Sequence, residues 1–171
     1  MQLLVIRHGP AGDRESWAAE TGEPDEARPL TSQGRKKTRA AARGMARTAE
    51  APAVLATSPL VRAAETAEIV ADAFDGVEVV VLDELRPERR PDELLGWLRG
   101  LPSDATAAVV GHDPHLGFLV GWLLTGRSES FVEMKKGAAI LLAFDDPPSG
   151  GNAVLRWALT PRQLRIVGRK G

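Results

Sequence analysis

The chain has 171 residues, of which 43% are hydrophobic and 26% charged, as in an ordinary soluble globular protein. Its 22 basic and 23 acidic side chains leave a net charge of −1, which gives no electrostatic basis for a nucleic acid or an anionic membrane as the main partner. The absence of cysteine excludes disulfides, thiolate zinc sites and a cysteine nucleophile. We expect residues 1–171 to form one domain, because this length is typical of a single core.

Neither of two apolar stretches indicates a membrane or a secretory signal. No basic residues precede the short apolar run near the N-terminus, as they would in a signal peptide. The stretch at residues 116–124 is far shorter than the roughly 20 residues that span a bilayer. We therefore expect a cytoplasmic protein.

Short apolar runs predict strands, and apolar residues at helical spacing predict helices. Thr31 is the expected cap of one helix, while Ser58-Pro59 and Asp113-Pro114 are expected to begin two others as an N-cap followed by proline. The sequence shows no internal repeat. In chain order the predicted elements are a strand at 3–6, a loop at 10–30, a helix at 32–49, a strand at 53–56, a helix at 59–74, a strand at 77–82, a short helix at 91–100, a strand at 107–111, a helix at 114–126 and a hairpin of strands at 138–144 and 154–159.

Strands that alternate with helices predict a three-layer α/β/α sandwich with a mostly parallel central sheet, to which the C-terminal hairpin adds an antiparallel strand. In such sheets the functional site lies beyond the carboxyl ends of the strands. Three loops are therefore candidates for one shared site: residues 7–9, residues 57–59 with Arg62, and residues 111–113.

Each basic residue of these loops has an ordinary explanation when considered alone. His8 could be a structural residue after a strand, Arg62 a solvated helix residue, and His112 a residue at a helix start without a role. Considered together, they favour an anion site, because two of the loops open helices whose free N–H groups and dipoles attract negative charge. Arg62 and Arg7 can each present a guanidinium fork to that anion, Arg62 gripping two of its oxygens.

We interpret the anion as a phosphoryl group and His8 as the nucleophile that receives it. A neutral imidazole is a good nucleophile near neutral pH, and arginines supply the charge stabilisation that phosphoryl transfer needs. A protonated His112 could donate to a phosphoryl oxygen. Gly9 would let the backbone turn sharply and expose its N–H.

These residues lie in four ordered motifs: R-H-G at 7–9, D-E-A-R-P-L-T-S-Q-G at 25–34, S-P-L-V-R-A-A-E-T-A at 58–67 and V-G-H-D-P at 110–114. Together the motifs resemble the histidine phosphatase superfamily, also called phosphoglycerate mutase-like. The second motif is similar to the D-x-x-R-P-L-T-x-x-G pattern of its SixA-type phosphohistidine phosphatases. The resemblance covers nearly the whole chain.

The resemblance implies a phosphatase that needs no metal or other cofactor. His8 would be phosphorylated during turnover, while Arg7, Arg62 and His112 would bind the phosphoryl group and its analogues phosphate, sulfate and vanadate. Arg28 would add a cation at the rim; alternatively, it is a surface arginine that pairs with Asp25. Ala11 stands where many members have threonine, so any contact from that hydroxyl is absent.

Glu84 is the candidate general acid, since a glutamate often has this role in the superfamily; alternatively, it pairs with Arg86 or Arg89. The segment from Glu84 to the strand at 107 has room for one helix, whereas capped members insert a helical subdomain there. We expect an open groove without a helical cap, which suits a phosphoryl group carried on a large molecule. Imidazole can leave as a neutral molecule and needs an acid less than an alkoxide does.

These residues support three hypotheses for the function. The leading one is a metal-independent phosphatase that acts on phosphohistidine of proteins. The second is a phosphatase of a small phosphorylated metabolite or nucleotide. The third is a non-catalytic phosphate-binding module, which would be indicated by loss of His8, Arg62 or His112, and none of these is lost.

Other conspicuous residues have simpler interpretations. The spacing of His112 and His115 could suggest a metal site, but no carboxylate or cysteine cluster completes it. Residues 35–37 with Arg39 are interpreted as a solvated helix face, or alternatively as a surface that steers an acidic or phosphorylated partner. The tryptophans expected to pack in or against the core are Trp97, Trp122 and Trp157.

Overall fold

The structure is a computed structural model that describes residues 1–169. Its centre is a six-stranded sheet in the order β3-β2-β4-β1-β5-β6. The β3-β2-β4-β1 part is parallel, whereas β5 runs antiparallel to both β1 and β6. The strands are β1 (Gln2–Arg7), β2 (Val54–Thr57), β3 (Val79–Val81), β4 (Thr106–Gly111), β5 (Ala139–Ala143) and β6 (Val154–Leu159).

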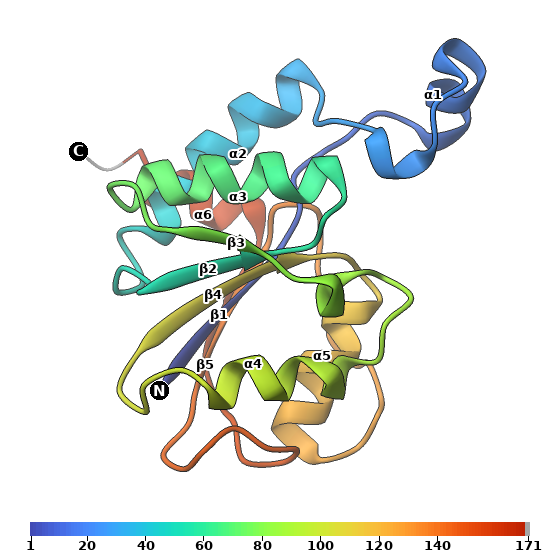
Figure 1. Cartoon of the computed structure of the whole chain (residues 1–171). Coiled ribbons are helices and arrows are strands. Elements are labelled where there is room, and N and C mark those ends of the chain that lie inside the picture. The colour runs from blue at the N-terminus through green and yellow to red at the C-terminus, as the bar shows by residue number, and fades with distance from the viewer. Residues whose placement is uncertain (170–171) are drawn as a thin grey trace.

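Helices cover both faces of this sheet. The α-helices are α1 (Arg14–Thr21), α2 (Ser32–Met45), α3 (Val61–Ala73), α4 (Leu95–Arg99), α5 (His115–Thr125) and α6 (Pro161–Val167), and the 3-10 turns are η1 (Asp25–Ala27), η2 (Asp83–Leu85) and η3 (Pro91–Leu94). Figure 1 shows α2, α3 and α6 on one face and α4 and α5 on the other, while α1 projects away from the body. The predicted three-layer α/β/α fold is confirmed. Between β3 and β4 the chain forms only η2, η3 and α4, so no helical cap is inserted there.

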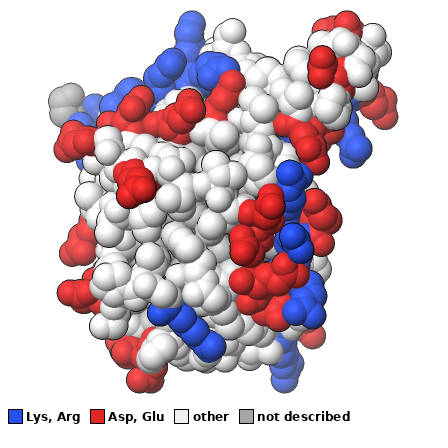
Figure 2. All heavy atoms as spheres, in the orientation of Figure 1, with Lys and Arg blue, Asp and Glu red and all other residues white. Residues whose placement is uncertain are grey.

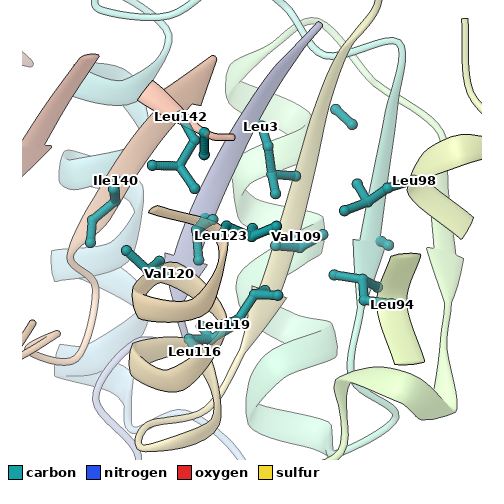
Figure 3. Close-up of a cluster of buried hydrophobic side chains, with 14 of the residues drawn as sticks. Leu3, Leu94, Leu98, Val109, Leu116, Leu119, Val120, Leu123, Ile140 and Leu142 are labelled. Atoms are coloured by element: carbon teal, nitrogen blue, oxygen red, sulfur yellow. The ribbon is translucent and has the colours of Figure 1, made fainter. Parts of the chain in front are cut away.

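A separate hydrophobic core fills each side of the sheet. Successive side chains of a strand point to opposite faces, so Leu3 and Val5 enter one core while Leu4 and Ile6 enter the other. In the first core, leucines of α4 and α5 face β1 and β4 (Figure 3). The tryptophans pack as expected, Trp97 and Trp122 against the first core and Trp157 against the second.

Two helices lie where no helix was predicted. The segment expected to be a loop contains α1, whose residues are all at least partly exposed and therefore provide no apolar stripe. The chain ends its described part in α6, which Thr160 and Gln163 begin with a capping box. The Thr31 cap of α2 is confirmed, since its hydroxyl accepts the Gly34 N–H at 2.8 Å.

The two predicted Ser-Pro and Asp-Pro helix starts are wrong. Helix α3 begins two residues later than expected, with Leu60 as its N-cap, and α5 begins at His115 with Pro114 as its N-cap. Neither start has a side-chain cap. The side chains of Ser58 and Asp113 are directed instead to His112 and Arg7, at the carboxyl ends of the strands.

Charged side chains gather in two places. Figure 2 shows basic residues over α2 and an interleaved set of acidic and basic residues below α1. On α2, Arg35 pairs with Glu65, while Lys36, Lys37 and Arg39 are exposed, as expected for a solvated face. Within residues 1–169, no helix is long and apolar enough to cross a membrane.

The contact between α2 and α6 gives the first prediction. A β-carbon at Gly44 would overlap the backbone carbonyl of Leu164, so Gly44→Ala must push the two helices apart. We expect a loss of about 1–3 kcal/mol in the free energy of unfolding, as for other overpacked sites. Gly96→Ala is the matched control, because nothing lies within 4 Å of its β-carbon position. Urea unfolding of both variants tests this, and equal stabilities would contradict it.

Candidate active site

The carboxyl ends of the three neighbouring strands β2, β4 and β1 bring the three candidate loops together. In the sheet register Arg7 lies opposite Gly111 and Thr57 opposite Val110, so the residues that follow each strand emerge side by side. The rings of His8 and His112 are 5.1 Å apart between centroids. The loops therefore share one site at this edge of the sheet.

The His8 ring has a defined tautomer. Its Nδ1 lies 2.7 Å from the carbonyl oxygen of Gly9, and because a carbonyl can only accept, Nδ1 must carry the proton. Nε2 then holds the free lone pair. Burial lowers the pKa of His8 to about 3, against the opposing effect of the Gly9 hydrogen bond, and the charges of Arg62, Arg7 and Lys136 lower it further. At neutral pH this histidine is uncharged.

His112 is held by Ser58 and is also neutral. Its Nε2 lies 2.9 Å from the Ser58 hydroxyl, and its Nδ1 is buried without a hydrogen-bond partner among the described residues. Burial lowers the pKa of His112 to about 2, and the proximity of His8 and Arg62 lowers it further. In the free protein the ring is therefore uncharged at neutral pH, because it is buried beside other positive groups.

Arg7 and Arg62 both reach the site with an unpaired Nε. Arg7 donates through Nη1 to the carbonyl of Met134 and lies 4.0 Å from the Asp113 carboxylate. Arg62, in the first turn of α3, donates through Nη1 to the carbonyl of Asp25 at 2.8 Å and pairs through Nη2 with its carboxylate at 3.2 Å. The Nε atoms of both arginines are buried without a partner among residues 1–169.

Arg28 is buried rather than on the surface, although it does pair with Asp25. Its side chain donates from Nε to the Asp25 carboxylate at 2.8 Å and from Nη1 to the carbonyl of Gly12. Only 8% of the residue is exposed. Burial acts to raise the pKa of Asp25, but the hydrogen bond from Arg28 and the charges of Arg62 and Arg28 hold it below its usual value.

Glycine is needed at position 9 for a different reason from the one expected. Its N–H is not exposed but donates to the Thr66 hydroxyl at 3.0 Å, which in turn donates to the carbonyl of Arg62 at 2.7 Å. A β-carbon at Gly9 would overlap the hydroxyl of Thr38 on α2. Glycine is therefore required for close packing between the loop and α2.

Glu84 lies on the η2 turn, directly after β3. The N–H of Leu82, two residues earlier, donates to the carbonyl of Thr57 at 2.9 Å, which ties the start of this turn to the end of β2. Among the described residues, Glu84 pairs with neither Arg86 nor Arg89, whose partners are Asp83, Glu26, Glu88 and Glu93. The alternative that Glu84 only forms such an ion pair is therefore wrong.

His115 lies in the first turn of α5, three residues after His112. Both of its ring nitrogens are buried without partners among residues 1–169, and burial lowers its pKa while Glu93 and Glu88 act to raise it. Within the part of the chain that the structure describes, no group of three or more histidine, aspartate or glutamate side chains could hold a metal ion.

Four residues that the motifs did not identify as site residues also shape this site: Asp25, Ser58, Thr66 and Lys136. Ser58 and Thr66 lie inside a quoted motif, but only the fold shows that they hold His112 and Gly9. Lys136 belongs to a distant segment that Gly137 anchors by donating to the carbonyls of Arg7 and His8. Desolvation lowers the pKa of Lys136, and nearby arginines lower it further, so its ammonium is a further cation of the site.

Comparisons with known proteins point to one family. The model of the histidine phosphatase superfamily (branch 1) matches residues 3–96. An uncharacterized protein of Picosynechococcus sp. is 34% identical over 142 residues, which cover 82% of this chain and 83% of that protein. Phosphohistidine phosphatase SixA of Escherichia coli is 29% identical over 98% of both chains. The solved structure of the protein histidine phosphatase SixA complexed with tungstate superimposes with a TM-score of 0.79 at 29% identity, over 96% of this chain and 99% of that one.

The depressed pKa values predict how stability depends on pH. Between pH 7 and pH 5 the unfolded chain begins to protonate His8 and His112, whose usual pKa is about 6.5, while the folded protein does not. The free energy of unfolding is therefore highest above about pH 6.5. It decreases as the pH is lowered, by up to about 1.4 kcal/mol per pH unit for each histidine. His8→Asn keeps an N–H donor for the Gly9 carbonyl but removes one of the two titratable imidazoles.

Urea unfolding of wild type and His8→Asn at pH 5, 6, 7 and 8 measures this effect. We expect the variant to lose less stability than wild type between pH 7 and pH 5, and the two slopes to agree between pH 7 and pH 8. The same loss for both proteins in acid would show that His8 does not carry the depressed pKa.

Proposed function

Because the chain belongs to branch 1 of the histidine phosphatase superfamily and is a phosphatase, we propose that it dephosphorylates phosphohistidine on proteins through a phosphohistidine on its own His8. The observation that carries the proposal is the hydrogen bond from His8 Nδ1 to the Gly9 carbonyl. It fixes the proton on Nδ1 and leaves Nε2 as an unprotonated nucleophile. Burial among cations keeps that nitrogen uncharged at neutral pH.

In the proposed first step, the Nε2 lone pair of His8 attacks phosphorus. The bond from phosphorus to the substrate nitrogen breaks, and its electron pair stays with the departing imidazole. That imidazole leaves as a neutral molecule when its other nitrogen carries a proton. Arg7, Arg62 and Arg28 offset the charge of the three phosphoryl oxygens, so positive charge for the step comes from the chain itself.

In the second step, water attacks the phosphorus held on His8. The bond from phosphorus to Nε2 breaks, its electrons return to the ring, and one proton of the water passes to a phosphoryl oxygen as inorganic phosphate forms. Phosphohistidine and water are thereby converted to histidine and phosphate. The Nδ1 hydrogen bond to Gly9 holds the ring in the same orientation for both steps.

The proposed role of His112 is that of a neutral donor. If the Ser58 hydroxyl donates to Nε2, the His112 proton lies on Nδ1, which has no other partner among residues 1–169. This Nδ1–H can then donate to a phosphoryl oxygen without any need for a charged ring. The contact strengthens as charge spreads over the oxygens in the transition state.

Two features support a protein-borne phosphohistidine as the substrate. The segment between β3 and β4 inserts no helical subdomain that could enclose a small substrate. The similar SixA protein of Escherichia coli is a phosphohistidine phosphatase. The solved structure of the protein histidine phosphatase SixA contains tungstate, an analogue of phosphate. A small phosphorylated metabolite or nucleotide is the alternative, which a comparison of substrates separates.

The nucleophile is tested by His8→Ala. We expect turnover of a phosphohistidine-bearing protein to fall roughly 10³-fold or more, since nucleophile replacements in enzymes have effects of this size or larger. Wild type quenched during turnover should carry an acid-labile, base-stable phosphoryl group, and the variant should carry none. Mass spectrometry of the intact protein and of its peptides measures this label.

Two outcomes would contradict this mechanism. One is wild-type turnover by a folded His8→Ala variant, with folding checked by circular dichroism. The other is activity that chelation with EDTA abolishes and zinc or magnesium restores, since the proposed mechanism takes its positive charge from arginines.

The substrate class is tested by Glu84→Gln, with Glu88→Gln as a control for another rim carboxylate. If Glu84 is the acid, hydrolysis of a phosphomonoester should fall roughly 100-fold, because an alkoxide leaving group needs a proton. Hydrolysis of phosphohistidine should fall less than about tenfold, since imidazole leaves without that proton. kcat/KM for both substrates is compared in one assay. Equal losses, or a tenfold wild-type preference for a small phosphomonoester, would favour the metabolite phosphatase.

A further inference from the structure

Two turns at the rim of the site have nearly the same sequence and the same local structure. Residues 25–29 read D-E-A-R-P and residues 83–87 read D-E-L-R-P, a match at four of five positions. Each forms a 3-10 turn in which the arginine N–H donates to the aspartate carbonyl, at 3.2 Å and 3.0 Å. In each, the arginine Nε donates to the aspartate carboxylate, at 2.8 Å in the first turn and 3.0 Å in the second.

The two turns are also joined to each other. Arg86 of the second turn donates to the carboxylate of Glu26 in the first at 2.9 Å. The turns are therefore neighbours at one rim, and local geometry alone does not distinguish them.

They differ in what the aspartate does beyond its own turn. The side chain of Asp83 is 66% exposed and, among residues 1–169, pairs only with Arg86. The side chain of Asp25 is 23% exposed, and its second carboxylate oxygen lies 3.2 Å from Nη2 of Arg62. The Asp25 backbone carbonyl also accepts from Nη1 of Arg62 at 2.8 Å. Of the two turns, the first is thus the one connected to the candidate active site.

Asp25 offsets the repulsion between the positive charges of Arg28 and Arg62. Burial lowers the pKa of Arg62, and the nearby charge of Arg28 lowers it further, so the guanidinium groups repel each other. Asp25 acts in the opposite direction through its charge and its hydrogen bond. One carboxylate shared by both groups lets two cations stand side by side in a partly desolvated place.

The shared contact also fixes the direction of Arg62. Nη1 and Nη2 each commit a hydrogen to Asp25, which holds the plane of the guanidinium. The buried Nε, which has no partner within the described part of the chain, and the remaining Nη hydrogens are left for an anion. Arg62 is thereby oriented before any phosphoryl group arrives.

We propose that Asp25 is a positioning residue of the phosphoryl site, which acts through Arg28 and Arg62 and does not itself touch the substrate. The inference rests on the proposed function, since it assigns the two arginines to phosphoryl binding. Asp25 aligns their donors with the transferring group, and it keeps the site less positive than the arginines alone would make it.

This role has a kinetic signature of its own. Asp25→Asn removes a negative charge near the anion, so binding of inorganic phosphate in the ground state should not weaken by more than about threefold and can become tighter. Misaligned arginines should nevertheless slow the chemical step, and we expect kcat to fall roughly 10- to 100-fold. A residue with a merely structural role would lower thermal stability without separating kcat from phosphate affinity.

Asp83→Asn is the matched control, since it breaks the same aspartate–arginine bond in the same kind of turn. The experiment measures kcat and KM for a phosphohistidine-bearing protein and Kd for inorganic phosphate by calorimetry, in wild type and both variants. We expect Asp83→Asn to stay within about twofold of wild type in all three values, as for other exposed ion pairs. Equal kcat values for Asp25→Asn and Asp83→Asn, or a loss for Asp25→Asn that lies wholly in phosphate affinity, would overturn the proposal.

Asp25→Glu keeps the test decisive if Asp25→Asn folds poorly. It retains the carboxylate on a longer side chain, and we expect it to keep phosphate affinity while recovering only part of the lost kcat. A folded Asp25→Glu whose kcat stays within about twofold of wild type would count against positioning by the carboxylate. Wild type that binds no phosphate and forms no phosphoenzyme would instead refute the proposed function, and the role of Asp25 with it.

Discussion

The site depends on gathering positive charge around an uncharged histidine. Arg7, Arg62 and Lys136 all act to lower the pKa of His8, and burial lowers it more than any of them. The same arrangement that would attract a phosphoryl group therefore keeps the proposed nucleophile unprotonated, because a proton on His8 would add one more positive charge to a desolvated cluster. Anion binding and nucleophilicity are two consequences of one electrostatic constraint.

That constraint requires the backbone to hold groups that would otherwise move apart. The sheet supplies most of this rigidity, since β1, β4 and β2 are hydrogen-bonded neighbours whose ends carry His8, His112 and Ser58. Cores on both faces keep the strands in place (Figure 3). The remaining cohesion is polar: the Gly9 N–H, the Thr66 hydroxyl and the Arg62 carbonyl form a chain that ties the first loop to α3.

Strand topology is the part of the site that sequence reasoning could predict. Parallel strands place their carboxyl ends at one edge, so the alternation of strands and helices is enough to bring residues 7–9, 57–59 and 111–113 together. The two predicted helix starts were wrong because serine and aspartate before a helix usually cap its backbone N–H groups, whereas here they contact distant residues. Ser58 lies next to His112, and Asp113 lies next to Arg7. Propensity describes a residue's local options and cannot include a partner that only the fold brings close.

Other features were missed for different physical reasons. Helix α1 has no buried residue, so only its Asp13 cap was available as a signal. The T-P-R-Q start of α6 was visible at residues 160–163, but α6 buries a single side chain, Leu164, and hence shows no periodicity. The contact of Asp25 with Arg62 joins positions 37 residues apart in the chain. No local sequence pattern distinguishes Asp25 from Asp83.

The unpaired buried atoms of the site complete the physical argument. Arg7 Nε, Arg62 Nε and His112 Nδ1 are buried without partners among residues 1–169, and a buried polar group left unpaired costs about 1–3 kcal/mol. Such a cost is tolerated where the two hydrophobic cores supply stability elsewhere. All three atoms belong to residues that we assign to phosphoryl binding, so an arriving anion would satisfy donors that the folded protein leaves unsatisfied. Binding would then gain from hydrogen bonds whose orientation was already fixed during folding, which is the form of preorganisation that favours a transition state with charge spread over its oxygens.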